Sequence, residues 1–147
     1  MSRLRALIAD CTAIMTVETA IVAPVLVAMA LGTYDVSSIV SRQSELQSAA
    51  AEAAAIVQAN PPITQAQRDV IRNVLSASTG IPTARVTVTP IYRCDTDPYV
   101  TTNTCTASQQ TSVFIQLRLI DTYSPFWTSI GAGSPMNYNV LRMVQIS

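Results

Sequence analysis

Residues 14–40 read IMTVETAIVAPVLVAMALGTYDVSSIV, and this stretch decides how the rest of the chain is arranged. Its apolar part, residues 14–31, contains a single ionisable side chain, Glu18. As a helix this part would rise about 27 Å, close to the hydrocarbon thickness of a bilayer. The stretch therefore predicts a membrane-spanning helix that continues, without a stop signal, into a polar helix outside the membrane.

Glu18 and Pro24 are the two unusual residues of this segment. A charged carboxylate in a membrane helix costs roughly 2.5–3.5 kcal/mol on insertion scales and calls for a cationic partner. No arginine of the chain lies at that depth. Cutting the chain before Ile14 would create an α-amino group, mostly cationic at neutral pH, four residues from Glu18. The alternative is a carboxylate that reaches the cytoplasmic interface without any role in assembly. Pro24 removes a backbone hydrogen bond and should kink the helix.

The charge distribution predicts which side of the membrane each part occupies. The formal net charge is zero and the nine cations are all arginines, so no basic surface points to nucleic acid. Arg3 and Arg5 precede the apolar run, which favours a cytoplasmic N-terminus. We expect a cytoplasmic leader over 1–13, a membrane helix continuing outside the membrane over 14–59, and a translocated domain over 60–147. The alternative is a conventional cleaved signal peptide, but the apolar run is long and interrupted for one.

The helix is expected to continue to residue 59. Apolar residues recur every three or four positions, which predicts one buried face, with polar residues on the opposite, solvated face. The predicted buried face consists of Val36, Ile39, Val40, Leu46, Ala50, Ala53 and Val57, and the solvated face of Ser41, Arg42, Glu45, Gln47 and Glu52. Small side chains over 48–55 either permit close approach of another helix or simply reflect helix propensity. Pro61 and Pro62 cannot continue the helix.

The remaining residues predict a second helix and a small sheet. Thr64 and Gln67 have capping-box spacing, and Gly80 follows the last helical turn. The apolar face of this helix is expected from Val70, Ile71, Val74 and Leu75. Alternating apolar residues then predict strands near 84–92, 113–119 and 138–146, with Pro90 typical of an edge strand. The predicted fold class is α+β: a long N-terminal transmembrane helix continuing into a soluble helix, a second helix and a three-stranded antiparallel sheet.

Cys94 and Cys105 enclose a polar loop, which we expect a disulfide to close in an oxidising compartment. A metal site is the alternative, but the chain has no histidine and no Cys-x-x-Cys spacing. The third cysteine, Cys11, falls on the predicted cytoplasmic side.

An aromatic cluster lies between the second and third predicted strands and consists of Tyr123, Phe126 and Trp127. One interpretation is a contact surface for a membrane headgroup layer or a neighbouring subunit. The other is a short connector whose aromatic side chains cap one end of the sheet. The sequence leaves both open.

Residues for catalysis are scarce. Without histidine there is no His-based triad, and without lysine no Ser-Lys dyad. The four glycines form no phosphate-binding loop. We therefore expect a non-enzymatic protein without cofactor or metal.

The residues 13–20, AIMTVETA, followed by Val22-Ala23-Pro24 and by Leu31-Gly32-Thr33-Tyr34-Asp35, resemble the TadE-like family of minor pilins (pseudopilins) from bacterial tight-adherence pilus systems. The residues that carry the resemblance are Ala13, Glu18, Pro24, Gly32 and Asp35. The segment SPFW at 124–127, the glycine-rich turn after it and the closing strand are also similar to the family's extracytoplasmic half.

The resemblance implies a pilin-like fold and a structural role in pilus assembly. It implies insertion in the bacterial inner membrane, with the N-terminus cytoplasmic and the domain periplasmic, and incorporation into a surface pilus. A prepilin peptidase would cut between Ala13 and Ile14, and Glu18 and Pro24 would serve subunit docking. Other partners would be pilin and minor pilin subunits and the assembly platform. Because Ala13 stands where prepilins usually place glycine, the alternative is an uncleaved, single-span periplasmic binding or scaffold protein.

Overall fold

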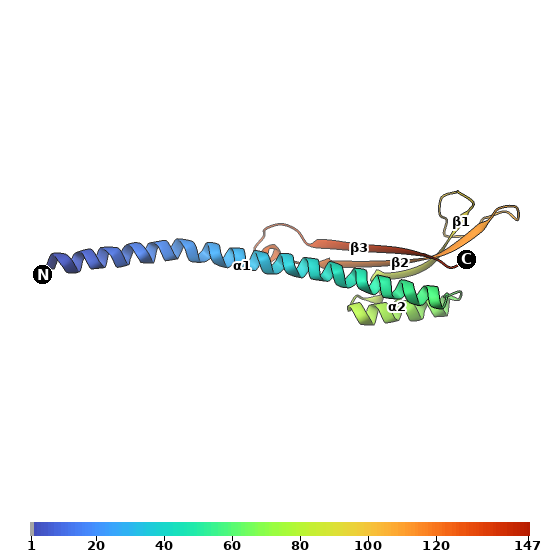
Figure 1. Ribbon diagram of the computed structural model, residues 1–147, viewed down its shortest axis with the longest axis horizontal. Helices are drawn as coiled ribbons and strands as arrows, with labels where there is room; N and C mark the ends of the chain where they lie inside the picture. Colours follow the sequence, from blue (N-terminus) through green and yellow to red (C-terminus); the bar gives the residue numbers. More distant parts are fainter. Residues whose placement is uncertain (1) are drawn as a thin grey trace.

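The computed structural model describes the backbone of residues 2–147 and the side chains of residues 18–147. Its elements are α1 (Ser2–Ala59), α2 (Gln65–Thr79), the short 3₁₀ helix η1 (Thr83–Arg85), β1 (Val86–Cys94), β2 (Thr111–Tyr123), α3 (Phe126–Ser129) and β3 (Met136–Gln145). Figure 1 shows that the first half of α1 projects alone, while its second half packs with the other elements in one domain. The predicted fold class, a long apolar helix followed by a second helix and a three-stranded antiparallel sheet, is confirmed.

Local sequence signals set the ends of both long helices. α1 ends at Ala59, directly before Asn60, Pro61 and Pro62. At the start of α2, the amide of Gln67 donates to the Thr64 hydroxyl, and the amide of Thr64 donates to the Gln67 side chain. This reciprocal capping box satisfies backbone donors that would otherwise have no partner. Gly80 ends α2 in the left-handed conformation, at φ 71°, which glycine adopts without strain.

The three strands form an antiparallel sheet in the order β1-β2-β3. Val86 pairs with Leu119, and Leu119 pairs in turn with Val140, so that apolar residues of all three strands share one face. Pro90 lies in β1, which pairs only with β2. It therefore occupies an edge strand, as its sequence predicts, because a central strand would need its missing N–H.

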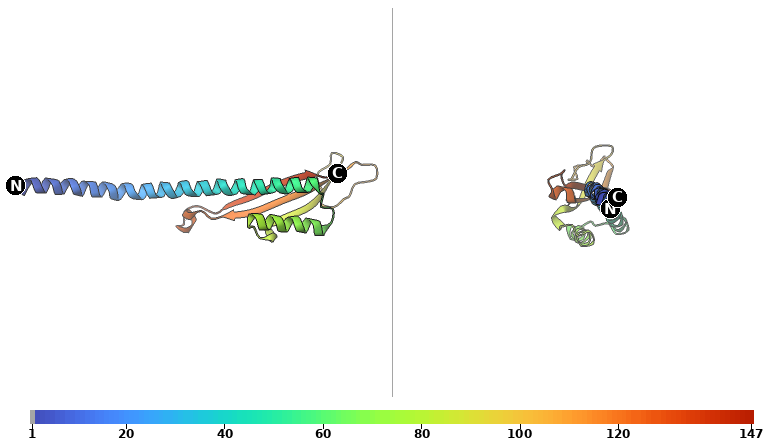
Figure 2. Two further views of the ribbon diagram at one scale, coloured as in Figure 1. Left: turned by 60° about the horizontal axis from the view of Figure 1, so that its bottom comes forward. Right: turned by 90° about the vertical axis from the view of Figure 1, so that its left-hand side faces the viewer.

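The core lies between this face of the sheet and the two helices. α1 packs on β2 and β3, and α2 packs on β1 and on α1, which gives two layers (Figure 2). The core consists of Leu46, Ala50, Ala53 and Val57 from α1, Ile71 and Leu75 from α2, Ile81, Val86, Val88, Ile115, Leu117, Leu119, Tyr138, Val140 and Val144. Small residues of α1 lie beside another helix, because Ala49 and Ala53 line a groove together with residues of α2.

The predicted faces of the two helices are partly wrong. Val36 and Val40 of α1 are exposed, whereas Arg42, assigned to the solvated face, is only 23% exposed. The reason is that polar partners from the sheet satisfy Arg42, while nothing within residues 18–147 covers the two valines. On α2, Val70 and Val74 are also exposed, and with Ile56 of α1 they line a groove of about 140 Å³ between the two helices.

Candidate functional site

The projecting half of α1 presents an almost uninterrupted apolar surface. Its exposed large apolar side chains are Ile21, Val22, Val25, Leu26, Val27, Met29 and Leu31, followed by Tyr34, Val36 and Val40. In the part of the chain that the structure describes, one helix is long and apolar enough to cross a membrane by length and composition, namely Glu18–Ala59 within α1. Its most apolar window is almost entirely exposed, so this surface is free to contact lipid or other helices.

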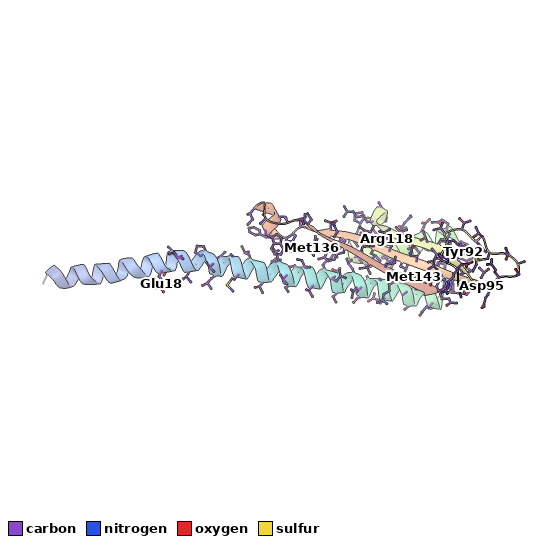
Figure 3. All side chains as sticks on the ribbon, turned by 90° about the horizontal axis from the view of Figure 1, so that it is seen from above. Glu18, Tyr92, Asp95, Arg118, Met136 and Met143 are labelled. Atoms are coloured by element: carbon purple, nitrogen blue, oxygen red, sulfur yellow. A yellow bond between two sulfur atoms is a disulfide. The ribbon has the colours of Figure 1, made fainter. Side chains whose placement is uncertain are left out.

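Glu18 lies on this projecting part, far from the domain (Figure 3). Its side chain is exposed, and among residues 18–147 none provides it with a hydrogen bond or an ion pair. A partner for the carboxylate would therefore come from outside this described part. Ala13 and Ile14, the expected processing site, lie outside the residues whose side chains the structure describes.

α1 runs through Pro24 without a break. Proline removes one backbone hydrogen bond from a helix interior. In Figures 1 and 2 the whole projecting half of α1 shows at most a gentle curve, so the expected kink is not pronounced. The helix is continuous on both sides of the proline, because only one of its backbone hydrogen bonds is lost there.

Asp35 connects α1 to the aromatic segment after β2. Its side chain is buried, with 2% of its surface exposed. The Tyr123 hydroxyl donates to Oδ1 at 3.3 Å, and the Phe126 amide donates to Oδ2 at 2.8 Å. A carboxylate that accepts an N–H at the start of a helix stabilises that end, here the start of α3. Asp35 belongs to the pattern that resembles the TadE-like family, but nothing local in the sequence predicts this contact.

Arg42 connects α1 to β2 and to the end of α2. Its guanidinium donates from Nε to Asp121 Oδ2 at 2.8 Å and from Nη2 to the Thr79 carbonyl at 2.9 Å. It also pairs with Glu45 at 2.9 Å. Burial opposes the charge of the guanidinium, but the hydrogen bonds to Glu45 and Asp121 outweigh that effect and raise the pKa of Arg42 above its ordinary value. The side chain is therefore a charged cross-link among three elements.

Tyr138 of β3 adds a third connection to the same face of α1. Its hydroxyl donates to the Ile39 carbonyl at 3.1 Å. Burial raises the pKa of this phenol, and Tyr123 and Asp121 raise it further. The face of α1 that carries Leu46 in the core therefore extends toward the projecting half. Along it lie Arg42, Ile39 and Asp35.

The aromatic cluster is divided by the fold. Tyr123 is partly buried and packs against the core, and Trp127 is also partly buried. Phe126, in contrast, is 51% exposed. The structure thus assigns Tyr123 to the connection with Asp35 and leaves Phe126 on the surface.

Cys94 and Cys105 form a disulfide that closes the loop between β1 and β2. The loop folds back on the sheet, because Tyr92 and Val100 exchange two backbone hydrogen bonds of 2.8 Å. The ring of Tyr99 also packs edge-on against Phe114. Disulfides persist in oxidising compartments, which indicates an extracytoplasmic domain.

Replacing Cys94 and Cys105 by serine is expected to lower the free energy of unfolding by about 2–3 kcal/mol, because the unfolded chain loses a short covalent loop. Urea unfolding of the full chain in detergent, followed by circular dichroism, measures this. Cys11→Ser is the matched control and should leave the midpoint unchanged. A double variant as stable as the parent would show that the loop holds without its cross-link.

Residues 13–55 match the model of a family described as TadE-like protein. The match includes Glu18, Pro24 and Asp35 and extends to the buried alanines of α1, and it confirms the resemblance over this stretch. The similar features in the later strands lie outside it. No curated protein and no solved structure matches the chain.

Proposed function

Because residues 13–55 belong to the TadE-like protein family, whose members are components of tight-adherence (Tad) pilus assembly, we propose that this chain is a minor pilin-like (pseudopilin) subunit of that system. It is inserted in the inner membrane by α1, with residues 1–13 as a cytoplasmic leader and residues 60–147 as a periplasmic domain. A prepilin peptidase removes the leader between Ala13 and Ile14. The mature chain then associates with pilin and minor pilin subunits through α1.

The observation that carries this proposal is the length of the exposed apolar surface on α1. A bilayer needs about 20 apolar residues, which the segment up to Leu31 nearly supplies. Exposed apolar side chains continue past it through Tyr34 and Val36 to Val40, beside the folded domain. A simple membrane anchor needs no apolar surface there, whereas helices packed side by side in an assembly would cover it.

Glu18 supports the same proposal, since its carboxylate has no partner among residues 18–147. In an assembly, the new α-amino group of one subunit would meet Glu18 of the next. Such a pair sets the axial register of neighbouring helices, because each charge is costly in lipid unless it is paired.

The proposal is tested by mass spectrometry of the N-terminus, on protein purified from membranes and from surface material sheared off cells. We expect a chain that begins at Ile14, with the mature form present in the sheared fraction. A chain that retains Met1 and never enters the sheared fraction would instead favour an uncleaved, single-span binding or scaffold protein, the alternative raised by Ala13.

A further inference from the structure

α3 is the part of the domain that lies closest to the projecting half of α1. Figures 1 and 2 show it at the end of the domain from which that half extends. The Phe126 amide fixes its level along α1, because it donates to Asp35 at 2.8 Å. In a bilayer that surrounds the projecting half of α1, α3 would therefore lie closer to the membrane surface than the sheet does.

The level of Asp35 corresponds to the headgroup layer. From Leu31 to Asp35 the helix rises about 6 Å. Polar headgroups extend a bilayer by roughly 5–8 Å beyond the hydrocarbon on each side. If residues 14–31 fill the hydrocarbon, as the proposed function requires, α3 lies among the headgroups of the periplasmic leaflet.

The surface of α3 has the chemistry of that layer. Residues 122–141 contain no charged side chain. Asp121, which directly precedes them, is bound to Arg42. Phe126 is 51% exposed and Ile130 is 69% exposed, and Tyr34 is exposed at the same level of α1. Tyr and Trp are enriched at membrane interfaces because they join an apolar ring to a polar group, and Tyr34 and Trp127 are of this kind. Phe126 and Ile130 are purely apolar and supply surface that lipid can cover.

Hydrogen bonds hold this surface in one conformation. The Thr128 hydroxyl donates to the Pro125 carbonyl at 2.7 Å, and the Ala132 amide donates to the Trp127 carbonyl at 2.9 Å. Gly133 lies so close to the Trp127 ring that an added Cβ would meet two ring atoms at 3.2 Å. A segment fixed in this way presents its exposed apolar side chains without a large ordering cost on binding.

We propose that α3 together with Ile130 is a membrane-surface anchor. Phe126 and Ile130 enter the boundary between headgroups and acyl chains in the leaflet from which α1 emerges, and Asp35 is the positioning residue that holds them at this depth. The anchor gives the periplasmic domain a fixed distance and orientation relative to the bilayer. The proposal rests on the insertion of α1 that the proposed function includes.

Trp127 is the only tryptophan of the chain, so its fluorescence reports on α3 alone. The full chain is reconstituted in phosphatidylcholine–phosphatidylglycerol vesicles whose acyl chains are brominated either near the glycerol or near the methyl end. We expect a roughly two-fold loss of Trp127 emission with bromines near the glycerol and a much smaller loss with bromines near the methyl end. Equal emission in brominated and ordinary vesicles would overturn the proposal.

Two variants make the test specific. Trp127→Phe with Tyr99→Trp moves the probe to the disulfide loop, which Figure 3 places at the opposite end of the domain near Asp95, and should abolish quenching. Phe126→Ser with Ile130→Ser replaces two exposed side chains, so the fold is retained while quenching of Trp127 should fall to the level of that control. Unchanged quenching in this double variant would show that α1 alone brings Trp127 to the lipid, and the anchor would be wrong.

Resistance of the parent chain to alkaline extraction from the vesicles is measured in parallel. A chain that is extracted would contradict the membrane insertion in the proposed function. A chain that resists extraction but shows no quenching of Trp127 would overturn only the anchor. Protection of Trp127 from both brominated lipid and aqueous acrylamide would also overturn it, because a neighbouring protein would then cover α3.

Discussion

Replacing Glu18 by alanine is expected to abolish surface pili while the protein remains in the membrane at its normal level. The side chain is exposed and makes no contact with the domain, so the fold of the single chain does not depend on it. Removing a carboxylate from an apolar helix also makes insertion easier, by less than the roughly 2.5–3.5 kcal/mol that a charge costs at the helix centre. The loss of pili would therefore arise from contacts between chains. Electron microscopy and immunoblots of sheared and membrane fractions measure the two parts of this prediction.

Two further variants at this position separate charge from shape, and a third variant, one turn away, is the control. Glu18→Gln keeps the size but removes the charge, and it should lose pili as alanine does if an ammonium group is the partner. Glu18→Asp keeps the charge and should retain part of the assembly. Val22→Ala changes an exposed apolar neighbour one turn away and should have little effect. Normal pili in Glu18→Ala would contradict the docking role.

The sequence predicts the elements well because each has a strong local signal. The two prolines after Ala59, the capping box at Thr64 and Gly80 each act over a few residues, and the structure shows helix ends at all three. The strands follow from the period of two in β1 and β2. β3 is less cleanly patterned because Arg142 pairs with Leu117 on the core side of an edge strand, where its side chain still reaches solvent.

The sequence does not predict the polar contacts of α1, because they join residues far apart in the chain. Phe126 lies 91 residues from Asp35, and no local pattern links them. A usable signal was nevertheless present. Extending the three- and four-residue spacing of the core backward from Leu46 leads to Arg42, Ile39 and Asp35. Choosing the buried face by apolarity alone selected Ile39 correctly, because it packs against the core. It also selected Val36 and Val40, which are exposed, and it missed Asp35 and Arg42.

Replacing Arg42 by alanine is expected to lower the free energy of unfolding by about 3 kcal/mol. The change leaves Asp121, whose side chain is 16% exposed, without its cation, and it leaves the Thr79 carbonyl without this donor. Removing one partner of a buried ion pair costs 3–5 kcal/mol, and the partial exposure of this pair favours the lower end of about 3. Urea unfolding of the full chain in detergent, followed by Trp127 fluorescence, measures the loss.

The matched controls distinguish the two sides of the Arg42 guanidinium. Glu45→Gln removes only the exposed partner and should cost about 0.5 kcal/mol or less. Arg42→Lys keeps the charge but loses the planar fork that reaches Asp121 and Thr79 together, so it should fall between the parent and alanine. Because the pKa of Arg42 is raised, deprotonation of this guanidinium removes its contribution only as the pH rises into strongly alkaline solution. A loss below about 1 kcal/mol for Arg42→Ala would mean that apolar packing from Leu46 to Val57 holds α1 on the sheet without this cross-link.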